Sequence, residues 1–258
     1  MQALRKQYNN NSRKSMVYTK SLSFAKDVYA TSEHFPDLVI REKLRESAIS
    51  IGTNIAQSRV TMYHAKEFNY LNGALLCISQ CRTLLQLALV RGFLMYEEFQ
   101  EAECKAVELL KMSFTLIKRL EQYVTNIEVE KWMVEDFRQS HLYNRSIDLM
   151  QTIYWLVDSV DFEINYEIAE EAYRLAINNP LFIATGIGQL NVKVRIKKFN
   201  EAKDNLGKLS RYLRQFNKTA CNNRAELKAI EECRIQVVKL LNSYFGRLKS
   251  SNTIEQVK

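Results

Sequence analysis

Apolar side chains recur along most of this chain at the three- and four-residue spacing of an amphipathic helix. The first such run begins at Met16 and ends at Phe35. Pro36 then forces an extended turn, and Asp37 is placed to cap the next helix. That next run, 38–59, gathers its apolar residues within about 80° at 100° per residue. The pattern predicts two helices joined by a short turn.

Six further runs have the same periodicity. Two of them, at about 65–91 and 96–124, complete a first set, and Gly92 is placed to end the earlier one. A second set of four follows, at about 143–164, 166–178, 192–216 and 224–248. Pro180 interrupts what would be the second helix of this set, and glycines at 186 and 188 would loosen it, so the sequence predicts a broken helix there.

The composition agrees with a helical protein. Seven glycines and two prolines in 258 residues are too few for the turns of a sandwich, barrel or Rossmann fold. The sequence therefore predicts an all-α protein built from two tandem up-down four-helix-bundle units. The expected divisions are a flexible basic tail at 1–15, a first bundle at 16–125, a connector at 126–142, a second, degenerate bundle at 143–250 and a tail at 251–258.

Short segments of the two sets align with each other. Residues 51–57 (IGTNIAQ) match 183–189 (IATGIGQ), and residues 66–69 (KEFN) match 197–200 (KKFN). The two offsets, 132 and 131 residues, are nearly equal. These matches predict a degenerate tandem duplication, and the alternative is two unrelated helical bundles.

The first unit carries short motifs in a fixed order, namely Phe24-Ala25 with Val28-Tyr29, His34-Phe35-Pro36, Leu44-Arg45 through Ala48, Ser50-Ile51 with Asn54-Ile55-Ala56, and Lys66-Glu67-Phe68. With them the first unit resembles the four-helix-bundle family of 23S rRNA intervening-sequence proteins and the accessory variability determinants of diversity-generating retroelements. Gln57 and Ser58 depart from the glutamate and glycine that the family typically has there. The resemblance implies a non-enzymatic bundle that assembles into rings, often pentamers, and, for the retroelement proteins, a basic partner of a reverse transcriptase and its RNA.

The net charge of +8 is unevenly distributed. Residues 130–172 carry three basic and ten acidic side chains, whereas 173–218 carry ten basic and two acidic ones. Within 192–216 and just beyond it, seven basic residues project into one arc of about 140° opposite the apolar side: Lys193, Lys197, Lys203, Lys208, Arg211, Arg214 and Lys218. Such a surface can neutralise phosphates of RNA or DNA. The alternatives are a solvated face or a face paired with the acidic 130–172 segment.

A smaller basic group lies in the first unit. Arg41, Arg45 and Arg59 project within about 40° of one another at the edge of the apolar arc. Arginine there can bind phosphate, hold a subunit interface or pair within the molecule. The segment 68–90 contains only Arg82 as a charge, so we expect that helix to be covered on both sides.

Residues with catalytic or metal-binding chemistry do not form recognisable motifs. Cys77 and Cys81 are one helical turn apart, but no histidine or second thiol pair is near, which favours two buried thiols. The three histidines lack catalytic or zinc-binding spacing, and the glycines form no phosphate cradle. We therefore expect no enzyme activity, metal or cofactor. With no C-x-x-C pair, leader or uninterrupted membrane span, the expected location is the cytoplasm.

Two functions from different classes fit these features. The first is an accessory or scaffold protein that binds nucleic acid and partners a reverse transcriptase. The second is a structural oligomerisation or protein-interaction module with no nucleic-acid role. If both units entered one ring as equivalents, each chain would supply two positions, and five positions could not be filled by whole chains. A pentamer would therefore have to be built from the first units alone, with five second units attached to it. The nearly uncharged segment 68–90 needs cover that the attached second unit can provide, so we favour a chain whose two units pack on each other.

Overall fold

The computed structural model describes residues 15–120, 123, 136–159, 162–219 and 224–255. Within these residues it contains eight α-helices and one short 3-10 helix, and no strand. The all-α prediction is confirmed. The chain divides into unit 1, residues 1–134 with 188–191, and unit 2, residues 135–187 with 192–258.

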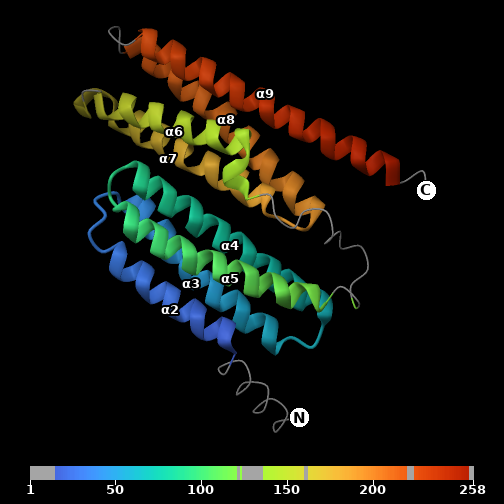
Figure 1. Cartoon of the computed structure of the whole chain (residues 1–258). Coiled ribbons are helices and arrows are strands. Elements are labelled where there is room, and N and C mark those ends of the chain that lie inside the picture. The colour runs from blue at the N-terminus through green and yellow to red at the C-terminus, as the bar shows by residue number, and fades with distance from the viewer. Residues whose placement is uncertain (1–14, 121–122, 124–135, 160–161, 220–223, 256–258) are drawn as a thin grey trace. The chain divides into compact units, whose positions relative to one another are not determined.

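Unit 1 is built from the helices α2 (Met16–Thr31), α3 (Leu38–Val60), α4 (His64–Val90) and α5 (Tyr96–Lys118) (Figure 1). Each helix packs on the next, and α2 also packs on α5, which closes a four-helix bundle. The helix ends follow the expected signals. Asp37 Oδ1 accepts a hydrogen bond from the Ile40 amide at 3.0 Å, and Gly92 has the left-handed φ of 71°.

Helix α4 is the central helix of this bundle. By length and apolar composition alone it could cross a membrane, but two thirds of its most apolar window is buried inside the protein. Its partners are α3, α5 and the segment Gly188–Asn191, from which Leu190 joins Phe68 in one apolar cluster. Asn72 Nδ2 also donates to Gln189 Oε1 at 2.7 Å. Burial on nearly all sides explains why this helix has so few charged residues.

Unit 2 is built from η2 (Phe137–Gln139), α6 (His141–Ser159), α7 (Phe162–Ile187), α8 (Val192–Thr219) and α9 (Arg224–Glu255). Helices α6 to α9 pack in sequence, and α6 also packs on α9, so the order of neighbours is the same as in unit 1. Helix α9 continues to Glu255, five residues beyond the predicted end of the bundle at 250. The basic tail, apart from Ser15, and most of the predicted connector lie outside the described residues.

The predicted break at Pro180 is wrong. Helix α7 runs through this proline without interruption to Ile187. Proline removes one backbone donor and crowds the preceding turn, where the carbonyl of Leu175 accepts hydrogen bonds from two side-chain amides. Asn205 of α8 donates at 2.6 Å, and Asn179 of α7 itself donates at 3.3 Å. The amide that Pro180 lacks would have bonded the carbonyl of Ala176, so these contacts hold the turn before the proline without replacing the lost bond.

Candidate nucleic-acid interface

Helix α8 separates an apolar face from a basic face. The six apolar residues of the predicted arc are all at most 4% exposed: Phe199, Ala202, Leu206, Leu209, Leu213 and Phe216. Their burial holds α8 between α7 and α9. Gly186 of α7 allows the closest approach, because a Cβ atom there would lie 2.4 Å from Cε1 of Phe199. The apolar arc therefore fixes the rotation of α8 about its own axis.

The opposite side of α8 is exposed and positively charged. Six of the seven predicted residues have exposed side chains: Lys193, Lys197, Lys203, Lys208, Arg211 and Arg214. We call these six residues the α8 basic face. Lys218 lies in the last turn of the helix, but its side chain is outside the described part of the structure. From Lys197 to Arg214 the helix rises about 26 Å at 1.5 Å per residue.

Acidic side chains on α8 dilute this face only slightly. Asp204 is exposed on the same side. Glu201, at its edge, is partly buried and accepts from Lys198 Nζ at 2.6 Å. Within the described residues, no ion pair joins Lys197, Lys203, Lys208, Arg211 or Arg214 to a carboxylate.

The described part of the acidic 130–172 segment forms ion pairs with other arginines. Asp136 binds Arg138 with 2.8 Å between Oδ2 and Nη2. Glu171 binds Arg174 at 2.7 Å and raises the pKa of that guanidinium. Asp148 binds Arg145 at 3.1 Å. These three carboxylates therefore pair with arginines outside the α8 basic face. The alternative that the acidic segment pairs with that face does not hold for them.

The three arginines singled out in unit 1 make contacts within that unit. Arg45 Nε donates to Ser32 Oγ at 2.9 Å, and its guanidinium carbon lies 4.7 Å from the centre of the Tyr29 ring. Arg41 Nη1 donates to the carbonyl of Phe35 at 3.5 Å. These contacts lie where α2 ends and the turn into α3 begins. Of the alternatives open for these two residues, the contacts favour intramolecular pairing.

Arg59 lies at the other end of α3. Its Nη2 donates to Ser15 Oγ at 3.4 Å, which ties the end of α3 to the start of α2. The three arginines therefore do not form one site, although they share one side of the helix.

Arg195 is not among the basic residues that the helical pattern predicts to be exposed. It lies on the apolar side of α8, only 2% exposed, and is among the largest fully buried side chains of the described chain. The 100° projection would have predicted this burial, because it places Arg195 in the apolar arc with Phe199 and Leu213 and not on the basic side. Arg195 therefore contributes to the interior of the protein and not to the α8 basic face.

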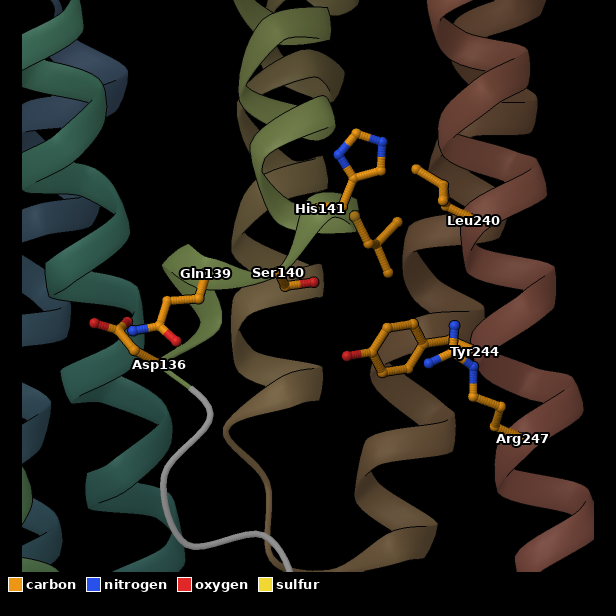
Figure 2. A pocket seen from close by; sticks show the side chains of 8 residues that line it. Asp136, Gln139, Ser140, His141, Leu240, Tyr244 and Arg247 are labelled. Carbon is orange, nitrogen blue, oxygen red and sulfur yellow. The ribbon is translucent and has the colours of Figure 1, made fainter.

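A separate cavity of about 310 Å³ lies in unit 2 between the start of α6 and the second half of α9. Figure 2 shows the Tyr244 ring extending from α9 toward Ser140, and His141 lies at the start of α6. Arg247 stacks over the Tyr244 ring at 5.5 Å. The only carboxylate among the residues lining this cavity is that of Asp136, which already binds Arg138 and caps η2. The lining mixes polar and apolar side chains, and among the described contacts no hydrogen bond joins Ser140 or Tyr244 to His141.

The thiols of α4 are buried, as predicted. Burial raises the pKa of Cys77 to about 11 and that of Cys81 well above its ordinary range. Cys77 Sγ accepts from Asn54 Nδ2 at 3.8 Å. No group of three metal-binding side chains occurs among the residues that the structure describes.

Comparison with protein families gives one result. Residues 13–115 match the family of the 23S rRNA-intervening sequence protein. This segment contains α2, α3, α4 and most of α5, so the similarity concerns unit 1 and does not reach the α8 basic face. Comparison with curated proteins and with solved structures found no significant match. The similarity to the retroelement proteins and the tandem duplication remain predictions.

Proposed function

We propose that this chain is a non-enzymatic accessory protein that binds RNA or DNA through the α8 basic face. The observation that carries the proposal is the row of exposed cations on α8, five of which make no ion pair with a described carboxylate. Lysine and arginine in such a row release condensed counterions when they approach phosphates. This contact is independent of sequence, so it supports binding to nucleic acid in general.

The length of the face matches this role. A span of about 26 Å is longer than several phosphate spacings of a nucleic-acid strand at about 3.4 Å per nucleotide along the duplex axis. The apolar side of α8 is buried inside unit 2, so the helix holds the cations of the opposite side in a fixed orientation. Rigid placement lowers the entropy lost on binding.

Charge reversal tests the proposal. The triple variant Lys208→Glu, Arg211→Glu and Arg214→Glu should lower affinity for a 20-nucleotide RNA by about a hundredfold at 0.1 M salt, because three phosphate contacts are lost. The matched control reverses Lys26 on α2 with Lys228 and Lys239 on α9, which are exposed and lie dispersed over two other helices. Both variants change the net charge equally. Equal loss of affinity in the two would show that only net charge matters and would contradict the proposal.

The same proposal includes a protein partner. The family match names an rRNA intervening sequence, and the resemblance to accessory variability determinants supports a reverse transcriptase as the partner that shares the bound RNA. Such complexes would form in the cytoplasm, which agrees with the free cysteines of the described chain. If a reverse transcriptase is encoded beside this chain, the two purified proteins should form a complex of defined stoichiometry. No complex at micromolar concentrations would leave RNA binding as the whole function.

A further inference from the structure

One end of unit 1 exposes aromatic rings. It is formed where α3 leads into α4 and where the chain leaves α5. Tyr63 is 67% exposed and Tyr123 is 58% exposed, with Met62 beside them at 88%. Exposed aromatic rings of this size are costly to leave in water and often mark a binding surface.

The rings are held in defined positions. The imidazole of His64 stacks on Tyr123 with 4.3 Å between ring centres and 16° between planes. Lys66 Nζ lies 5.2 Å from the centre of the Tyr63 ring. We call Tyr63, His64 and Tyr123 the aromatic end of unit 1. It brings residues at the start of α4 together with a residue nearly sixty positions later, and all three side chains are exposed.

Cations surround this aromatic end. Lys66 is exposed in the first turn of α4, and Lys118 and Arg119 are exposed at the end of α5. The amides of the first turn of α4 point the same way and add the positive end of that helix dipole. Glu67 is the described carboxylate that faces the ring cluster, with Oε2 3.6 Å from His64 Nδ1. Among these described residues, three are cations and one is a carboxylate.

We infer that the aromatic end of unit 1 binds unpaired bases of a single-stranded nucleic acid. Every base has a flat face that can stack on an aromatic ring, and cations around the ring bind the flanking phosphates. A duplex keeps its bases stacked inside and cannot use such a surface. The inference shares with the proposed function only the class of ligand, because the aromatic end lies in unit 1 and the α8 basic face in unit 2.

Abasic strands separate stacking from charge. The full chain is titrated with a fluorescent 12-nucleotide uridine strand and with an abasic strand of equal length and phosphate number. Wild-type protein should bind the base-bearing strand about tenfold more tightly. The double variant Tyr63→Ala and Tyr123→Ala should lose this preference, whereas Tyr63→Phe and Tyr123→Phe together should keep it. The matched control is Tyr96→Ala, since Tyr96 is 61% exposed at the start of α5, at the opposite end of the bundle.

Each outcome bears on one of the two sites. Charge reversal on the α8 basic face should weaken both strands by the same factor and leave the preference for bases intact. Equal binding of the two strands by wild-type protein would overturn the stacking inference without affecting the α8 proposal. The inference would also be overturned if the alanine variant kept the preference for bases. If the alanine variant keeps the preference for bases but has a different mass by light scattering, the aromatic end serves contact with another protein chain instead.

Discussion

Removing one partner of the buried ion pair between Arg82 and Glu103 should destabilise unit 1 by about 3–5 kcal/mol. Arg82 Nε on α4 donates to Glu103 Oε1 on α5 at 2.7 Å, and the two side chains are 5% and 6% exposed. Replacing either one leaves the other as a buried charge without its counterion. Replacing both leaves no charge to desolvate.

The perturbation is a double-mutant cycle with Arg82→Met, Glu103→Leu and the combination. Each single variant should lose about 3–5 kcal/mol of unfolding free energy. The double variant should lie within about 1 kcal/mol of the wild type, which gives a coupling energy of about 5 kcal/mol or more. Near-additive losses would refute the view that desolvation of an unpaired charge dominates at this site.

The assay must report on unit 1 alone, because the chain contains two bundles. Cys77 and Cys81 are buried in unit 1, Cys233 is buried in unit 2, and Cys104 is exposed. Pulsed alkylation at increasing urea, with each cysteine peptide resolved by mass spectrometry, follows the two units separately. The midpoint should move for Cys77 and Cys81 and stay constant for Cys233, while Cys104 labels at every urea concentration.

The remaining predictions concern pH, packing and assembly. Burial raises the pKa of Cys77 to about 11 from its ordinary 9.0. Between pH 9 and 11 the unfolded chain therefore releases a proton that the folded chain keeps, so the unfolding free energy of unit 1 should fall as the pH rises through this range. Urea titrations at several pH values measure this loss. Gly186→Ala places a Cβ 2.4 Å from Phe199 and should cost unit 2 about 1–3 kcal/mol, whereas Gly207→Ala, with open space around it, should stabilise by about 0.5–1 kcal/mol; thermal melts showing equal effects would contradict this. Light scattering should give a mass of one or two chains, and a mass near five chains would contradict the expected packing of the two units on each other.

The helical pattern was sufficient to predict the fold class and the two faces of α8. Burial follows the 100° projection closely there, because a single amphipathic helix packed on one side needs no knowledge of its partners. Local signals were equally informative at Asp37 and Gly92, where a cap and a left-handed residue act within one turn. These features depend only on neighbouring residues in the sequence.

Features that depend on contacts between helices could not be predicted in the same way. Pro180 predicts a helix break, but α7 continues through it, and Asn205 of α8 donates to the carbonyl of Leu175 five residues before the proline. The partner of Arg82 required the relative register of α4 and α5. The aromatic end likewise depends on the contact between Tyr123 and His64. Helical periodicity within one segment does not predict a contact between residues so far apart in the sequence.

The salt dependence of RNA binding tests the central proposal most directly. For wild-type protein the logarithm of the association constant should fall linearly with the logarithm of salt concentration, with each phosphate contact adding about 0.7 to the slope for a single strand. Reversing Lys208, Arg211 and Arg214 should reduce that slope by about 2, while the dispersed control should leave it unchanged. Identical slopes for all three proteins would contradict a phosphate-binding role for the α8 basic face.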